Sequence, residues 1–342
     1  MKRNHLKVGV VLVCVTGLAY GAVIATNEAR SKRSNLETSL AEATPIATSA
    51  APDTDTVSIS QLQPDATTQA SSMIYVRGCT IISSLPFTIR ASGRYCYASD
   101  LVSSSFYGVR IEANDVDLDC RGFSTATSMG RTGGTNGISV IGGSHHATIK
   151  NCKVSGFDLG ITAFAGSTYG RILNNHVDSS LSIGIGAWGD FAHVTGNRVS
   201  NTHPEDSTQH ATGISLYPVS PEIAAQGQVV ANNVVVNTYG GSGAIGIYVS
   251  GSAAPVIRGN SIIELRPADG GFSFGLWLAN WAQGANTTGA RIIGNQIMSR
   301  NANFTDVFMQ SGQADRCDAN ITIGTPSNFS NCAAGSDNRA VP

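Results

Sequence analysis

The segment 202–212 (THPEDSTQHAT) contains the densest group of ionisable side chains in the chain. It includes His203, Glu205, Asp206 and His210. Imidazole and carboxylate groups can abstract protons, hydrolyse glycosidic bonds or bind divalent cations. Their spacing matches no metal-ligand pattern, so we expect no metal or other cofactor. The alternative interpretation is a solvated polar loop.

Two further charged residues could join this candidate catalytic set. Asp190 could supply another carboxylate, although a lone aspartate is more often a turn residue. Arg266 could neutralise a substrate carboxylate, which a lyase needs when it removes the proton beside a uronic acid.

A repeat indicates how these residues are positioned. A glycine followed by an apolar residue starts each of six similar segments, at Gly137, Gly160, Gly184, Gly213, Gly246 and Gly275. Each segment contains three short runs of alternating apolar residues separated by polar turns. Such runs indicate strands, and their recurrence predicts stacked solenoid coils that each supply one strand to each of three parallel sheets. The residues after the glycines should form an inward column: Ile138, Ile161, Ile185, Ile214, Ile247 and Leu276.

An asparagine recurs between the second and third strand of these repeats. The positions are Asn175, Asn197, Asn233, Asn260 and Asn295, and Cys152 takes the equivalent place in the first repeat. Asparagine tolerates the left-handed backbone of a sharp turn, and its amide can bond to the asparagine of the next coil. We predict a structural ladder here.

Alternation along the glycine-led strands places aromatic residues on the outer face of the first sheet. They are Phe164, Trp188, Tyr217, Tyr248 and Trp277, with Trp281 beside them. Aromatic faces suit the C–H faces of sugars, so we interpret these residues as candidate substrate-binding residues. Alternatively, loops 202–212 and 265–273 cover the rings, or the rings stack on one another.

The chain divides into three parts. Residues 1–25 have a basic start and an apolar run, which indicates a cleaved export signal or a retained membrane anchor. Residues 26–72 are rich in Ala, Thr, Ser and Pro and predict a disordered tether. Residues 73–342 form the expected folded domain. We therefore expect a secreted, periplasmic or cell-surface protein, with a membrane contact only if the anchor is retained.

The overall charge limits the kinds of partner, and the cysteine content predicts disulfides. The chain has 22 basic and 23 acidic residues, so nothing in its overall charge favours nucleic acid. Six cysteines follow the signal: Cys79, Cys96, Cys120, Cys152, Cys317 and Cys332. In an oxidising compartment they predict three disulfides, for which 15 connectivities are possible. Pairing of sequence neighbours would place disulfides at both ends of the domain.

The chain resembles secreted right-handed parallel β-helix proteins of the pectin-lyase-like superfamily. The resemblance covers about Tyr75 to Cys332 and rests on the glycine-led coils, the asparagine column, and DVDLDCRGF followed by ATIKNCKVSGF. It implies an all-β fold, a single-stranded right-handed parallel β-helix of about seven to nine coils, with ligands along the first sheet. The family includes polysaccharide lyases, glycoside hydrolases, epimerases, adhesive surface proteins and phage fibres. The arginine motif of pectate lyases and the aspartate pairs with Gly-His-Gly of polygalacturonases are not found.

Two functions remain open. The first is binding or processing of an acidic extracellular or periplasmic polysaccharide along an aromatic groove; an enzyme of this kind would be a lyase or have a glycoside hydrolase or epimerase-like activity. The second is a non-catalytic surface adhesin or structural envelope protein. An enzyme requires two or three titratable groups within hydrogen-bond reach in one cleft, whereas an adhesin requires only the aromatic residues.

Overall fold

A computed structural model describes residues 75–76, 78–205, 209–268, 271–281, 284–298, 304–309, 316–323, 329–330, 333–334 and 337–341. The expected signal (1–25) and tether (26–72) lie outside this part, as do Asp206 and Cys332. Within the described part every regular element is a β-strand. No helix there is long and apolar enough to cross a membrane.

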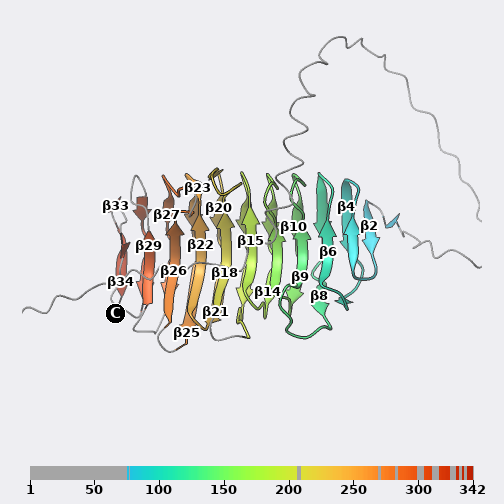
Figure 1. Cartoon of the computed structure of the whole chain (residues 1–342), viewed down its shortest axis with the longest axis horizontal. Helices are drawn as coiled ribbons and strands as arrows, with labels where there is room; N and C mark the ends of the chain where they lie inside the picture. The colour runs from blue at the N-terminus through green and yellow to red at the C-terminus, as the bar shows by residue number, and fades with distance from the viewer. Residues whose placement is uncertain are drawn as a thin grey trace, which may run out of the picture. The chain divides into compact units, whose positions relative to one another are not determined.

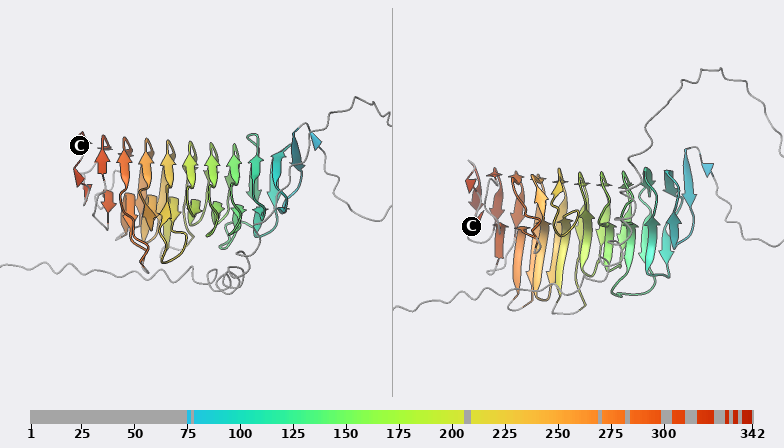
Figure 2. Two further views of the ribbon diagram at one scale, coloured as in Figure 1. Left: turned by 90° about the horizontal axis from the view of Figure 1, so that it is seen from above. Right: turned by 45° about the horizontal axis from the view of Figure 1, so that its top comes forward.

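Three parallel sheets run along the stack of coils (Figures 1 and 2). The first sheet contains β3 (Phe87–Ile89), β6 (Tyr107–Ile111), β9 (Asn136–Val140), β12 (Leu159–Ala163), β15 (Ile183–Trp188), β18 (His210–Tyr217), β22 (Gly243–Ser250), β26 (Phe272–Ala279), β29 (Phe304–Met309) and β32 (Phe329–Ser330). The second contains β2 (Cys79–Ile82), β4 (Gly93–Tyr97), β7 (Val116–Asp119), β10 (Thr148–Lys150), β13 (Arg171–Leu173), β16 (His193–Thr195), β20 (Val229–Ala231), β24 (Val256–Arg258), β27 (Arg291–Ile293), β30 (Arg316–Asp318) and β33 (Ala333–Ala334), with β1 (Tyr75–Val76) antiparallel to β2. The third contains β5 (Leu101–Ser103), β8 (Ser124–Thr127), β11 (Lys153–Ser155), β14 (His176–Asp178), β17 (Arg198–Ser200), β21 (Val234–Gly240), β25 (Ser261–Pro267), β28 (Gln296–Met298), β31 (Ile321–Ile323) and β34 (Arg339–Val341).

The chain visits the three sheets in turn and then returns to the first, one coil further along. Strands β9, β10 and β11 form one such coil, and β12 pairs in parallel with β9 to start the next. A small extra sheet pairs β19 (Ala225–Gln226) with β23 (Ser252–Ala253). The all-β parallel β-helix predicted from the repeat is therefore confirmed, and it extends to ten strands in the first and third sheets.

The predicted inward column forms the centre of the core. Its six residues are in register from coil to coil and have no exposed surface: Ile138, Ile161, Ile185, Ile214, Ile247 and Leu276. Burial of an aliphatic side chain of this size contributes roughly 1.5 to 3 kcal/mol. Each coil adds one such residue, so stacking itself stabilises the fold.

The asparagine ladder is also confirmed, and it lies in the turn from the second to the third sheet. The Asn175 amide donates to Asn197 Oδ1 at 3.0 Å, and Asn197 donates in the same way to Asn233. The backbone N–H of Cys152 donates to Asn175 Oδ1, so Cys152 does occupy the first position of the column. The expected left-handed backbone belongs instead to the preceding residue, as at Asn174 and Asn232. The ladder side chains therefore point inward to their partners.

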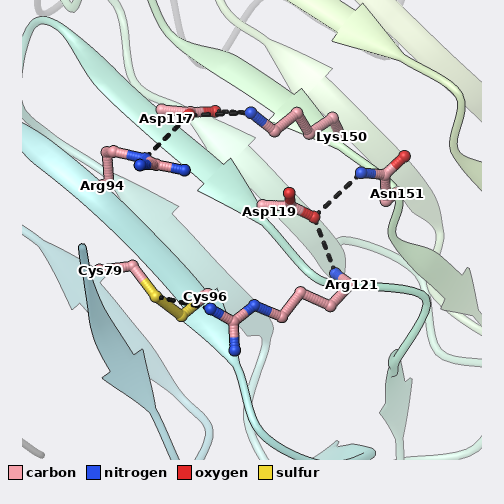
Figure 3. Close-up of polar contacts among 8 residues, drawn as sticks. All are labelled: Cys79, Arg94, Cys96, Asp117, Asp119, Arg121, Lys150 and Asn151. Atoms are coloured by element: carbon pink, nitrogen blue, oxygen red, sulfur yellow. Dashed lines mark hydrogen bonds and ion pairs between the residues drawn. A yellow bond between two sulfur atoms is a disulfide. The ribbon is translucent and has the colours of Figure 1, made fainter. Parts of the chain in front are cut away.

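Disulfides and ion pairs link neighbouring coils at the N-terminal end of the described domain (Figure 3). Figure 3 shows the disulfide that joins Cys79 to Cys96, and a second disulfide joins Cys120 to Cys152. Asp117 lies between Arg94 and Lys150, which come from the strands on either side of it. Both predicted pairings of these four cysteines are confirmed, and disulfides are compatible with an extracellular location. Cys317 is also disulfide-bonded.

Candidate functional site

Six aromatic side chains form a continuous row on the outer face of the first sheet. Strand register brings Trp188 beside Tyr217 and Tyr248 beside Trp277. Gly186 makes room for the row, because a Cβ at this position would come within 2.9 Å of the Trp188 ring. We call the set Phe164, Trp188, Tyr217, Tyr248, Trp277 and Trp281 the aromatic row.

The rings of the aromatic row contact one another. Trp188 stacks on Tyr217 with centroids 4.3 Å apart and planes at 11°, and Phe164 stacks on the other side of Trp188 at 5.6 Å. Trp281 stands at 89° to Tyr217. Parallel rings cover each other's faces, whereas a perpendicular pair covers a face of only one ring. The predicted alternative that the rings stack on one another therefore holds for Phe164, Trp188 and Tyr217. Trp281 is instead perpendicular to its neighbour Tyr217.

Burial varies along the aromatic row. Tyr217 is only 8% exposed, and this burial raises its pKa to about 12, although a hydrogen bond to Ser215 opposes the shift. Burial also raises the pKa of Tyr248. The other four rings are half-buried. Tyr217, expected at the surface, is thus a supporting ring beneath its neighbours.

His203 lies at the loop that enters β18, in contact with Arg131 and Tyr239. Arg131 donates to the His203 carbonyl and lies 3.4 Å from its Nδ1, and the Tyr239 ring is 4.6 Å from the imidazole. Partial burial, followed by the Arg131 charge, lowers the pKa of His203 below its usual value. His203 is therefore neutral near pH 7, which leaves a ring nitrogen able to accept a proton.

His210 is the first residue of strand β18 and is not part of a loop. Its Nδ1 lies 3.0 Å from the Ser242 hydroxyl, and its ring contacts Phe272. Burial lowers its pKa. His210 thus has a different set of neighbours from His203.

The other members of the candidate catalytic set have separate partners again. Arg266, which lies in strand β25, forms an ion pair with Glu264 at 2.5 Å. The Asp190 carboxylate accepts the Gln226 N–H of the next coil at 2.8 Å, which is a contact between coils. Glu205 is exposed. The described part also contains no group of three His, Cys, Asp or Glu side chains that could hold a metal.

Sequence reasoning missed several neighbours of these residues. Arg131 reaches His203 from the loop between β8 and β9, and no local pattern connects the two positions. Phe272 and Phe274 contact Trp277, at 5.8 Å and 4.9 Å, and extend the aromatic row. Alternation could not have found them, because in FSFGLW it places Phe272 and Phe274 on the side of the inward-facing Leu276 and opposite Trp277.

The chain is similar to one protein family and to several solved structures. Residues 136–324 match the family described as the right-handed beta helix region. The Dettilon tailspike protein is 15% identical, with a TM-score of 0.39 over 74% of this chain and 60% of that one. The catalytic domain of a GH87 alpha-1,3-glucanase in complex with nigerose is 13% identical, with a TM-score of 0.39 over 78% and 62%. Tailspike protein 2 from the Escherichia coli O157:H7 bacteriophage CAB120 is 12% identical, with a TM-score of 0.31 over 69% and 39%.

These similarities concern the fold alone. The chain spans less than two thirds of the length of each of the three structures. No curated protein matches it in sequence. The family match, however, covers more than half of the 342 residues and agrees with the three parallel sheets. The protein therefore belongs to the family of right-handed β-helix proteins.

Proposed function

We propose that this protein binds an extracellular or periplasmic polysaccharide along the outer face of the first sheet. One observation carries the proposal: the aromatic row gives that face a continuous line of rings across five successive coils. A sugar ring presents C–H groups that pack favourably on such apolar surfaces. A polymer aligned with the helix axis would repeat this contact from coil to coil.

The geometry of the rings assigns them different roles. Tyr217 is buried and supports Trp188 by stacking at 4.3 Å. Trp281 is perpendicular to Tyr217 and half-buried, so its indole has a face that this stack does not cover. Trp277 meets Tyr248 at 72° and is also half-buried. We therefore expect Trp281 to contribute most to sugar binding, since Trp277 also packs on Phe272 and Phe274.

Binding is favoured over catalysis because no hydrogen bond or ion pair joins two of the described candidate catalytic residues, although Arg266 lies in register beside Tyr239, which contacts His203. His203 contacts Arg131 and Tyr239, His210 contacts Ser242, and Arg266 is paired with Glu264. Acid–base catalysis requires such groups to converge on one reacting bond. A non-catalytic adhesin or envelope protein requires only the aromatic row.

Lyase chemistry is the second candidate, because His203 and Arg131 are adjacent. A neutral imidazole could remove the proton beside a uronic carboxylate, and the guanidinium could stabilise the charge that develops. The electron pair would then form a C=C bond as the glycosidic C–O bond breaks, and water or the imidazolium would protonate the departing sugar oxygen. In that mechanism both residues would act on the same sugar. Replacement of either would then abolish turnover.

Binding of the full chain to a panel of neutral and uronic-acid polysaccharides tests the proposal. We expect Trp281→Ala to weaken binding of the neutral polysaccharides at least about tenfold, which is the size of effect typical of a central aromatic contact. Phe106→Ala is the control, since Phe106 is 58% exposed and has no contact with the aromatic row. Equal affinity of the two variants would contradict the proposed surface.

The same incubations separate binding from catalysis. Absorbance of unsaturated products and the number of reducing ends should both stay constant over time. Unsaturated products that disappear in Arg131→Gln would instead support the lyase.

A further inference from the structure

The outer faces of the second and third sheets carry cationic side chains on both sides of the asparagine ladder. On the third sheet, Lys153, His176 and Arg198 occupy one register position in three successive coils. On the second sheet, Arg171 and His193 are paired in the same way. All five side chains are exposed. We call these five residues the basic band.

Carboxylates neutralise little of this band. The seven ion pairs among the described residues include neither Lys153, Arg171 nor Arg198. Asp100 interacts with Lys153 through charge alone. Asp178 interacts with the histidine of its own strand, but hydrogen bonds from Ser200, Ser179 and Asn201 already occupy its oxygens. The positive charges of Arg171 and Arg198 therefore lie at the surface without a carboxylate paired to them.

The band brings its permanent charges close together. Neighbouring strands lie about 4.8 Å apart, so Lys153 and Arg198 are two strands apart with His176 between them. The effect is visible at His193, whose pKa is lowered by partial burial and then by the Arg171 charge. The net charge of the whole chain, −1, does not reveal the basic band, because acidic residues elsewhere in the chain offset its positive charges.

We propose that the basic band is a binding surface for a linear acidic polysaccharide whose carboxylates run along the helix axis. Lys153, His176 and Arg198 supply one donor group per coil, so a polymer with one carboxylate per sugar can follow them in a single direction. Arg171 extends the contact across the turn to the second sheet. An arginine binds a carboxylate through two parallel N–H donors, which adds geometric selectivity to the attraction.

A polysaccharide fits this surface better than nucleic acid for two reasons. Disulfides such as Cys120–Cys152 persist in oxidising compartments outside the cytosol, where acidic polysaccharides are abundant. The net charge of −1 also gives the protein no general attraction to a polyphosphate backbone. The surface lies on the second and third sheets and does not involve the aromatic row.

Calorimetric titration of the full chain with polygalacturonate tests this inference. The test variant is the double substitution Arg171→Gln with Arg198→Gln. The control is Arg94→Gln with Arg316→Gln, which removes the same charge from exposed arginines that are paired with Asp117 and Asp318. Melting temperatures of both variants should match the wild type, because all four side chains are exposed.

We expect the test variant to bind about five- to tenfold more weakly at about 50 mM salt and to lose much of the salt dependence. The control should change affinity by less than about twofold. Equal losses in both variants, or binding of single-stranded DNA as tight as that of polygalacturonate, would overturn the inference. A neutral glycan titrated in parallel separates this surface from the aromatic row: Trp281→Ala should affect the neutral glycan, and the arginine variant should not.

Discussion

At the scale of single residues, the asparagine ladder shows what a recurring side chain can and cannot predict. Recurrence at one place in every repeat predicted the amide ladder, because only a stacked arrangement brings those positions together. The left-handed turn belongs to the residue before, such as Asn232, whose φ is 56°. Asn232 adopts the left-handed backbone conformation, whereas Asn233 forms the ladder. The sequence alone does not show which of the two asparagines has which role.

Asn233→Ala should destabilise the fold strongly. Asn233 Oδ1 accepts from the backbone and the amide of Asn197, and its own amide donates to the Val194 carbonyl at 2.9 Å. Alanine would leave these buried groups unpaired, at roughly 1 to 3 kcal/mol each before relaxation. Asn232→Gly is the control, because glycine tolerates a positive φ. Urea unfolding should show a large loss for the first variant and little for the second; similar losses would count against the ladder as the cause.

The histidines predict how stability depends on pH. Burial lowers the pKa values of His193, His203 and His210 below 6.5, with help from arginines at the first two. The unfolded chain therefore binds protons first as the pH falls, so stability is complete above about pH 6.5 and decreases below it. Melting temperatures at about pH 7.5 and about pH 5.5 should differ less in His210→Gln than in the wild type. A wild type that becomes more stable toward pH 5.5 would contradict these shifts.

At the scale of strands, the glycine that starts each repeat has a steric cause. A Cβ at Gly184 would lie 2.3 Å from Val199 Cγ1 and 2.7 Å from the carbonyl oxygen of Gly213 in the next coil. Sequence analysis predicted these strands and their register because glycine marks the close approach in every coil. It placed His210 and Arg266 in loops, because the longer strands β18 and β25 continue through polar residues that carry no alternating pattern.

Gly184→Ala should therefore be costly. Both clashing atoms are held by neighbouring strands, so relief requires movement of two sheets, and such overpacking costs about 1 to 3 kcal/mol or more. Gly133→Ala is a suitable control, because a Cβ there meets nothing within 4 Å. Thermal unfolding should show a lower melting temperature for the first variant alone. An unchanged melting temperature would mean that the glycine column is not under steric constraint.

At the scale of the described domain, the solenoid presents different chemistry on different faces. The aromatic row lies on the first sheet, and the basic band lies on the second and third. Alternation within the strands predicted the aromatic row, since each residue's face follows from its position. It could not predict contacts such as that between Arg131 and His203, because loops reach across coils without any local signal.

Intrinsic fluorescence gives the most direct test of polysaccharide binding at the aromatic row. The chain has 3 tryptophans, Trp188, Trp277 and Trp281, and all belong to the row. Tryptophan emission, excited selectively so that the tyrosines do not contribute, therefore reports on this surface alone. Titration of the full chain with the neutral polysaccharides should give a saturable change in emission, with the affinity that calorimetry measures for the same polymer. Binding of a neutral polysaccharide by calorimetry without any change in emission would place it elsewhere and contradict the account.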